Sequence, residues 1–283
     1  MLEVGDEYGA PTLEDTGLEI LDLQDDPTFA ARQLHTRDAA MQLEALERLA
    51  RCFVESPETV LQELVNAAVS LCGADSAGVS IEQTDKGDEE YYYWAATAGE
   101  YTSFLGATLP RSPSACGMCI ERGRPQLMRV GKPFFDLLGV VALTVTDGLL
   151  LPWQVEETRG TVWIVAHGRT EAFDGNDLRM MQSLATFAAM AVRQQRQQEK
   201  LLEQARATAA AAMANDLAHQ INNPLQGLTN ILYLASEGRD VQEQQGVQGA
   251  GDAKALAQLA SGDLNRLSLL VKKLLALPFA KGQ

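Results

Sequence analysis

One segment of the chain combines residue types that can carry group-transfer chemistry: residues 218–225, Ala-His-Gln-Ile-Asn-Asn-Pro-Leu. Apolar residues recur through it at steps of three and four, which predicts an amphipathic helix over about residues 205–236. On such a helix His219 and Asn223 lie on the polar side, away from the apolar stripe. A solvent-facing imidazole keeps a nucleophilic ring nitrogen. The segment therefore places an accessible nucleophile on a helix.

Two further features of this helix bear on how it positions the histidine. Pro224 lacks the N–H that would bond to the carbonyl of Gln220, so the helix is expected to bend just after His219. The apolar stripe is narrow, and a narrow stripe favours packing in a helical bundle. Its members are Met213, Leu217, Ile221, Leu225, Leu228 and Leu232.

The run from His219 to Leu225 resembles the H-box of sensor histidine kinases, which lies in their dimerisation and histidine-phosphotransfer (HisKA, or DHp) domain. The resemblance implies that His219 accepts a phosphoryl group and passes it to an aspartate of a response regulator. It implies that Asn223 helps to orient water in the reverse, phosphatase reaction, and that Pro224 forms the kink. The family usually has an acidic general base directly after the histidine, where this chain has Gln220. Because an amide cannot accept that proton, the pattern supports phosphoryl acceptance better than autokinase activity.

The composition limits the classes of partner. The chain has 283 residues and a formal net charge of −15, which argues against nucleic acid or an anionic membrane as its main partner. No apolar run reaches the length of a membrane span, and the N-terminus lacks the features of a signal peptide. We therefore expect a cytoplasmic protein. Most of the acidic segment 1–35 is expected to be mobile.

The middle of the chain alternates helix and strand patterns. Two amphipathic helices, about 37–54 and 57–72, precede every predicted strand. A helix over 114–122 is closed by Gly123, and a long helix begins near Phe173. These elements describe an α+β sensor domain built on an antiparallel sheet. The predicted strands are 76–82, 91–95, 126–130, 140–145, 149–155 and 160–166.

The sequence of this region resembles the C-terminal half of a GAF domain. The resemblance covers residues 38–195. The matching runs are Cys116-Gly117 with Glu121-Arg122-Gly123, then residues 160–167, and finally Phe173-Asp174 with Asp177-Leu178. The resemblance implies an antiparallel sheet flanked by helices, with a pocket for a small molecule. It does not identify that molecule.

The spacing Cys116-x-x-Cys119 could indicate a metal or redox site. A zinc site needs two more ligands, and no nearby residues supply them, so we expect no metal here. Both thiols are expected to line the sensor pocket or its core. A covalent bilin would, by resemblance to phytochrome-type domains, require a histidine directly after Cys116, where Gly117 stands. Arg111, Arg122, Arg124, Arg129 and Lys132 either neutralise an anionic ligand at the pocket mouth or form a solvated surface.

Beyond the sensor region, a helix without Pro or Gly is expected to run from residue 176 to residue 223. A loop over 238–251 and a leucine-striped helix over 252–277 follow. One such helical hairpin cannot bury both of its apolar stripes alone, so two chains are expected to form a four-helix bundle. The long helix would join the domains as a parallel coiled coil in the dimer.

The domains expected are therefore an acidic segment (1–35), a GAF-like sensor domain (36–195), a coiled-coil linker (196–212) and a DHp-like helical hairpin (213–283). No Walker-type motif and no room for a nucleotide domain are found, so ATP and Mg²⁺ would come from a separate kinase or a regulator. The expected partners are a second copy of the chain, a response-regulator receiver domain, and an unidentified small molecule. We expect a histidine phosphotransfer protein of a two-component system. The alternatives are a dimerising scaffold whose His219 is never phosphorylated and a fragment of a conventional histidine kinase.

Overall fold

Seven strands of the chain form one antiparallel sheet in this computed structural model, which describes residues 16–23, 26–245 and 250–275. The sheet has the strand order β1-β5-β6-β7-β2-β3-β4 and belongs to the first of two units, residues 1–198. Its longest ladder joins β6 and β7 from Asp147 to Ala166. The strands are β1 (Leu18–Asp22), β2 (Ser76–Glu82), β3 (Tyr92–Gly99), β4 (Thr108–Leu109), β5 (Gln126–Val130), β6 (Asp147–Val155) and β7 (Thr158–Ala166).

Capping residues set the helix boundaries. Asp38 accepts backbone N–H bonds at the start of α2, and Ser114 does so at the start of α4. Gly73 and Gly123 close α3 and α4 in the left-handed conformation. The helices are α1 (Pro27–Ala30), α2 (Ala39–Glu55), α3 (Val60–Cys72), α4 (Ala115–Arg122), α5 (Lys132–Leu137), α6 (Gly175–Gln245) and α7 (Ala250–Leu275). Within the described residues no helix has the length and apolarity needed to cross a membrane.

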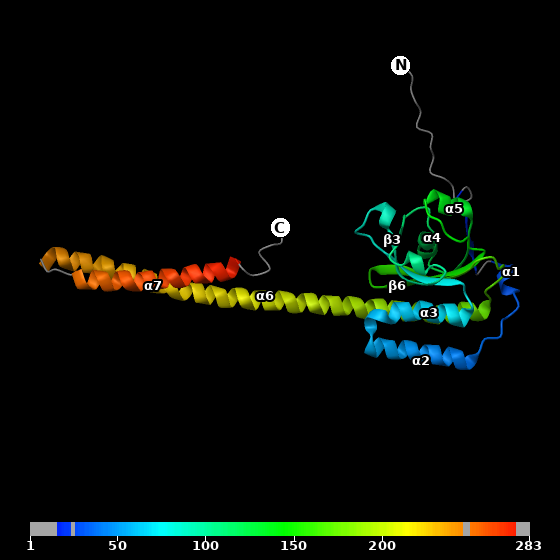
Figure 1. Ribbon diagram of the computed structural model, residues 1–283, viewed down its shortest axis with the longest axis horizontal. Coiled ribbons are helices and arrows are strands. Elements are labelled where there is room, and N and C mark those ends of the chain that lie inside the picture. The colour runs from blue at the N-terminus through cyan, green and yellow to red at the C-terminus, as the bar shows by residue number, and fades with distance from the viewer. Residues whose placement is uncertain (1–15, 24–25, 246–249, 276–283) are drawn as a thin grey trace, which may run out of the picture. The chain divides into compact units, whose positions relative to one another are not determined.

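Apolar side chains on both faces of the sheet are buried. In Figure 1, α2, α3 and the first part of α6 cover one face, and α4 and α5 lie over the other. Because successive strand residues face opposite sides, Ile164 packs in the core under α3 and α6 while Trp163 and Val165 pack in the second core. The sheet is therefore the central layer of three, and the predicted α+β class with a GAF-like sheet is confirmed.

Residues that the sequence predicted to be mobile are part of the folded first unit. The expectation of a mobile segment up to residue 35 does not hold for its second half, because β1 pairs with β5 along the edge of the sheet. Leu18 and Phe29 are buried. The acidic composition concealed this strand, because its charged residues lie on the outer side and pair with arginines, as Glu19 does with Arg129.

A buried ion pair fixes the end of this segment. The guanidinium of Arg32 donates to both carboxylate oxygens of Asp147, at 2.7 and 3.0 Å, and to the carbonyl of Phe173 at 2.7 Å. Both side chains are almost fully buried. Since Asp147 begins β6 and Phe173 precedes α6, one side chain joins the N-terminal segment, the sheet and the long helix.

Two other predicted boundaries are wrong. Residues 140–144 form no strand, and only Val145 makes a single bridge, to Val130. β5 pairs with β1 along one edge and with β6 only at Gln126 and Leu127 on the other, so the segment meets β5 in a single bridge at Val130 and forms no ladder. The predicted loop over 238–251 is shorter, because α6 continues to Gln245 and α7 begins at Ala250. Residues 246–249 and the predicted helix end at Leu277 lie outside the described residues.

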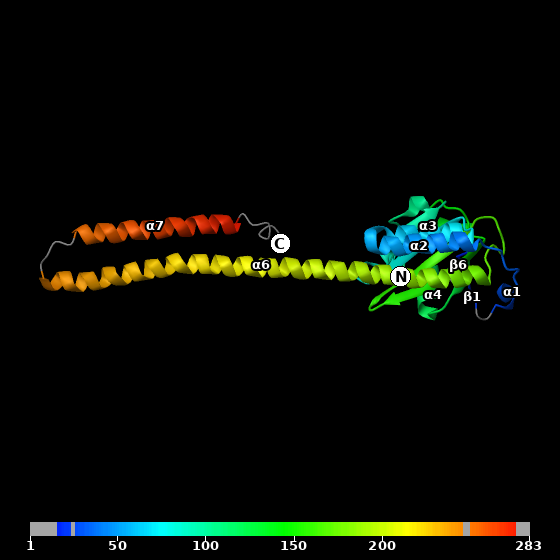
Figure 2. The same ribbon diagram turned by 90° about the horizontal axis from the view of Figure 1, so that it is seen from below.

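The second unit, residues 199–283, consists of the later part of α6 and α7, which runs back beside it (Figure 2). The helix expected to be uninterrupted from residue 176 to 223 is confirmed, and α6 also continues past Pro224. Gly227 of α6 lies against the carboxylate of Asp263 of α7, which fixes the register of the two helices. The seam residues, buried or half-buried at steps of three and four, are Leu217, Ile221, Pro224, Leu228 and Ile231 on α6 and Ala260, Asp263, Leu267 and Leu270 on α7.

Replacing Arg32 with Met is expected to destabilise the first unit by about 3–5 kcal/mol, because it leaves the carboxylate of Asp147 buried and unpaired. Urea unfolding followed by tryptophan fluorescence measures this, since all three tryptophans lie in that unit. The double variant Arg32→Met/Asp147→Leu should recover part of the loss.

The matched control is Arg129→Met, which removes the exposed pair to Glu19 between β1 and β5. Its expected effect is about 0–1 kcal/mol. Equal losses in the two single variants would show that the buried pair does not hold the segment in place.

Candidate functional site

The face of the sheet under α4 and α5 contains a cavity of about 450 Å³. Ring side chains from β3, β7, α5 and the segment after β3 form much of its wall. Apolar residues of the segment after α5, among them Leu138, Val140 and Ala142, form another part. The aromatic wall residues are Trp94, Tyr101, Phe104, Phe134, Phe135 and Trp163. A partly open, mainly apolar hollow of this size is typical of a small-molecule site.

The aromatic rings contact one another and form a continuous wall. Trp94 lies with its ring centroid 4.9 Å from that of Trp163, and Tyr101 lies 5.4 Å from Phe104. Trp163 covers the bare backbone of Gly78, its cross-strand partner on β2, where an added Cβ would come within 2.1 Å of the indole. A glycine inside a predicted strand is thus the signal in the sequence for this close packing.

Cys116 reaches the cavity from the first turn of α4. Its sulfur lies 3.3 Å from the hydroxyl oxygens of Ser80 and Thr161, which themselves lie 2.7 Å apart. Burial raises the pKa of the Cys116 thiol, and the two hydroxyl contacts oppose that effect only in part. The site therefore holds a neutral thiol, which is a poor nucleophile.

The other cysteine of the pair, Cys119, does not line the cavity. It is fully buried beside it, and its thiol donates to the carbonyls of Arg124 and Leu150. Burial also raises the pKa of this thiol. The structure thus brings the two predicted residues onto one short helix but gives only Cys116 access to the cavity.

The five basic residues considered for an anionic ligand do not line the cavity. Arg129 pairs with Glu19 and Lys132 with Asp136. Arg111 lies over the ring of Tyr91. The solvated-surface interpretation fits these positions better than the anion-binding one.

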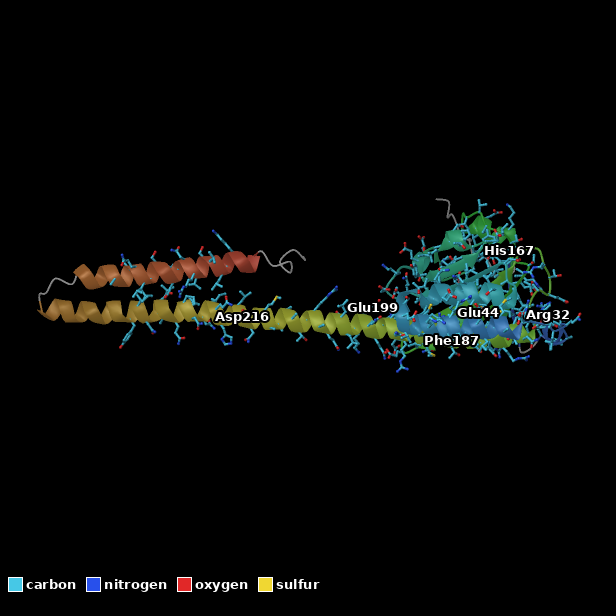
Figure 3. All side chains as sticks on the ribbon, turned by 60° about the horizontal axis from the view of Figure 1, so that its bottom comes forward. Arg32, Glu44, His167, Phe187, Glu199 and Asp216 are labelled. Atoms are coloured by element: carbon cyan, nitrogen blue, oxygen red, sulfur yellow. The ribbon has the colours of Figure 1, made fainter. Side chains whose placement is uncertain are left out.

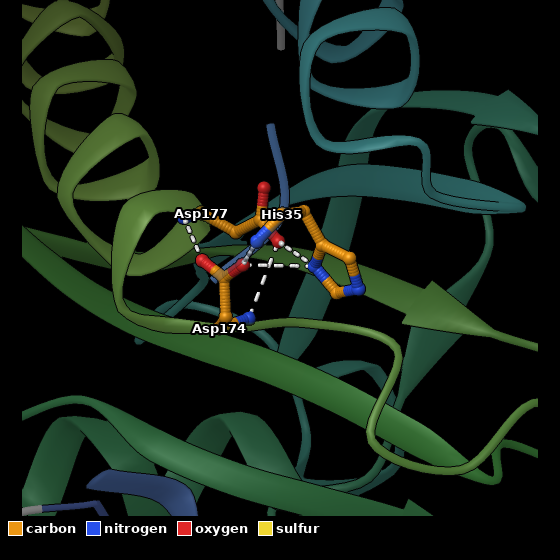
Figure 4. A group of neighbouring side chains, drawn as sticks. All are labelled: His35, Asp174 and Asp177. Carbon is orange, nitrogen blue, oxygen red and sulfur yellow. Dashed lines mark hydrogen bonds and ion pairs between the residues drawn. The ribbon is translucent and has the colours of Figure 1, made fainter. Parts of the chain in front are cut away.

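A separate cluster lies where α6 begins, and its geometry decides whether it could hold a metal ion. His35, Asp174 and Asp177 have ligand atoms within 4.8 Å of one another (Figure 4). The carboxylate of Asp174 accepts N–H bonds from His35, Asn176 and Asp177, and that of Asp177 accepts two bonds from Arg37 at 3.0 and 2.9 Å. Burial opposes ionisation of Asp174, but the backbone donors outweigh it and lower its pKa. The carboxylate oxygens are used as helix caps, so the cluster is structural.

The H-box residues lie in the second unit. His219, Gln220 and Asn223 are exposed, whereas Pro224 is buried in the seam with α7. The side-chain amide of Gln220 donates to the carboxylate of Asp216 at 2.8 Å, and Figure 3 shows Asp216 on α6. His219 sits between the seam residues Leu217 and Ile221 in sequence and therefore faces outward from the hairpin.

The fold and the cavity define a small sensor domain with a central antiparallel sheet. The family model of the GAF domain matches residues 54–193. This part of the chain is therefore a GAF domain, a module that is common in sensor kinases.

Solved structures resemble part of the chain, among them two GAF domains. The phycoerythrobilin-bound GAF domain of a cyanobacterial phytochrome is 13% identical, and the match covers 57% of this chain and 100% of that one, with a TM-score of 0.43. The GAF domain of a protein described as a sensor histidine kinase from Pseudomonas syringae pv. tomato is 22% identical over 58% and 94%, with a TM-score of 0.39. Free methionine-R-sulfoxide reductase from Neisseria meningitidis is 18% identical over 59% and 98%, with a TM-score of 0.43. No curated protein sequence matches the chain.

The thiol environments predict a specific labelling pattern. In the native chain a disulfide-exchange reagent should react first with the half-buried Cys52, and at least about tenfold more slowly with Cys116, Cys119 and Cys72. The reason is that each unit of pKa above the ambient pH lowers the thiolate fraction about tenfold. Thiol counting with time, in native buffer and in denaturant, measures this, and Cys52→Ser should remove the fast phase. Fast reaction of Cys116 would contradict the neutral-thiol assignment.

Proposed function

We propose that the chain is a two-component signalling protein, in which the GAF domain binds a small molecule and His219 accepts a phosphoryl group. The observation that carries the proposal is the position of His219, exposed on the outer side of α6 and opposite the seam with α7. Pro224 and the seam residues hold the helix pair together on the inner side, while the imidazole stays accessible to a partner domain.

The chemistry is attack by a ring nitrogen of His219 on phosphorus, with in-line departure of the donor oxygen. The donor is the phosphoryl-aspartate of a regulator or the γ-phosphoryl of ATP held by a separate kinase. A P–N bond forms, a P–O bond breaks, and the other ring nitrogen releases its proton. In the onward step a regulator aspartate takes the phosphoryl group, with Mg²⁺ supplied by the regulator, and Asn223 would orient the water of the reverse, phosphatase reaction.

The side chain after the histidine limits the proton step. Gln220 cannot accept a proton, and its amide is bonded to Asp216, so a carboxylate lies on the same surface one turn before His219. This arrangement favours a phosphotransfer protein served by other enzymes. The absence of an acidic residue at position 220 also favours the scaffold alternative. Unlike the phosphotransfer proposal, the scaffold alternative requires no modification of His219.

A second apolar stripe supports assembly of two copies into a four-helix bundle. The predicted α6 stripe divides in the structure, since Leu217, Ile221 and Leu228 pack in the seam while Leu225 and Leu232 are 46% and 70% exposed. On α7, the residues that directly follow the seam are Leu264 and Val271, 57% and 49% exposed. Because the helices run in opposite directions, residues that directly follow a seam residue face the same side of the hairpin.

This second stripe, defined as Leu225, Leu232, Leu264 and Val271, carries no charge and can meet its own copy across a two-fold axis. Its burial would complete a four-helix core, as one hairpin alone cannot. The outward position of His219 lies off the stripe and stays exposed in such a dimer. Further exposed apolar residues of this unit are Met213, Tyr233, Leu259 and Leu269.

Phosphoryl transfer to the purified chain tests the proposal directly. A radiolabelled phospho-regulator, or a separate histidine kinase with ATP, should place an acid-labile label on the wild type and none on His219→Ala. Gln220→Glu should increase labelling by the kinase by about tenfold or more, because it restores a general base. Labelling that persists in His219→Ala, or no label from any donor on an intact dimer, would leave the scaffold alternative.

The dimer interface has its own test. Leu225→Glu combined with Leu264→Glu should convert the dimer into a monomer, because it places four charges in the shared core. Light scattering or sedimentation measures the mass. The matched control is Gln226→Glu, next to Leu225 but off the stripe, which should remain dimeric. A dimer that survives the double substitution would place the interface elsewhere.

A further inference from the structure

The charge of the cavity wall restricts what the GAF domain can bind. Among the described residues no lysine or arginine lines the cavity, and the one charged residue of its wall is Glu89, which is exposed. The remaining wall is apolar or aromatic, apart from Thr108 and the neutral thiol of Cys116. We propose that this cavity binds an uncharged, mainly aromatic molecule. The inference deepens the proposed sensor function and rests on it.

An anionic ligand would have no counter-charge there. Burying a charged group without a partner is strongly unfavourable. The nearby cations are already engaged, with Arg129 on Glu19, Lys132 on Asp136 and Arg111 over the ring of Tyr91. Glu89 would repel an anion further. Nucleotides, phosphorylated molecules and carboxylic acids therefore do not fit the site.

A cationic ligand is also disfavoured, for a different reason. Cation binding by rings requires free ring faces, with the cation within about 6 Å of the centroid. Here Trp94 is packed by Trp163 at 4.9 Å and by Phe104 at 6.0 Å, so these rings use much of their surface on one another. The wall that they leave is mainly apolar and includes the indole N–H of Trp94, which has no hydrogen-bond partner among the described residues, so it suits flat aromatic groups that can accept a hydrogen bond.

The size of the cavity sets the scale of the molecule. A volume of 450 Å³ lies within the range of about 300–1,000 Å³ that small-ligand sites occupy. Removing apolar ligand surface from water contributes about 25 cal/mol per Å², so two or three fused or linked rings could bind without any ion pair.

A larger side chain in one wall of the cavity can block ligand binding. Ala142 lines the cavity from the segment between α5 and β6, and the adjacent Val141 is 99% exposed. A tryptophan at position 142 would fill the cavity, whereas one at position 141 would remain in solvent. Ala107, between Phe104 and β4, offers the same kind of blocking position from another wall.

The experiment compares two probes with one ring system on the full chain. Neutral N-phenylnaphthylamine is titrated against its sulfonated relative, anilinonaphthalene sulfonate, and energy transfer from the tryptophans reports binding in the first unit. The neutral probe should bind at least about tenfold more tightly. Ala142→Trp and Ala107→Trp should each weaken it by about tenfold or more, and Val141→Trp should not change it. Circular dichroism confirms that each variant is folded.

Equal affinity for the two probes, or neutral-probe binding that neither blocking variant weakens, would overturn the proposal. The phosphoryl label on His219 is read in the same preparation. If the neutral probe binds more tightly but His219 takes no label, the phosphotransfer function is overturned and the proposed ligand class stands. If His219 is labelled but the two probes bind equally, the ligand class is overturned and the phosphotransfer function stands.

Discussion

The buried pair between Arg32 and Asp147 is the constraint on which much of the first unit depends. Two charges removed from water are stable only in a narrow range of geometries, and here the terminal nitrogens of Arg32 make three hydrogen bonds while its Nε has no partner among the described residues. Here that geometry includes the carbonyl of Phe173, directly before α6. The N-terminal segment, the start of β6 and the start of α6 are thereby held at one point. Three basic residues of this segment each contact an aspartate: Arg32 contacts Asp147, His35 contacts Asp174 and Arg37 contacts Asp177.

The two faces of the sheet are covered differently, and the site lies on the face under α4 and α5. On one face the long helices α2, α3 and α6 pack on a core that includes Phe173, Met181 and Leu184. On the other, the short helices α4 and α5 and the irregular segment after them cannot cover the sheet as closely, and large rings leave a hollow between them. Gly78 also shapes this face of the sheet, because only a residue without a side chain allows Trp163 to pack directly on the strand.

In the helical hairpin of the second unit, each helix carries two apolar stripes. Seam positions at alternating steps of three and four pair α6 with α7, and the next position along each helix forms a second apolar stripe. The sequence pattern merged the two stripes of α6 into one, since periodicity reports that a face is apolar but not which neighbour covers it. His219 lies outside both stripes and is exposed.

Local signals in the sequence determined the secondary structure of most elements: the closing Gly123 of α4, the strand-like runs of β2 and β7, and the stretch free of Pro and Gly from residue 176 to residue 223. They also indicated the exposed position of His219, because helical periodicity alone separates polar from apolar sides. The tertiary structure alone decided the rest. Arg32 and Asp147 are 115 residues apart in the chain, β1 required a free edge of β5, and residues 140–145 meet β5 only in the single bridge from Val145 to Val130. Contacts of this kind depend on which surfaces remain available after the sheet has formed, and short-range patterns carry no information about that.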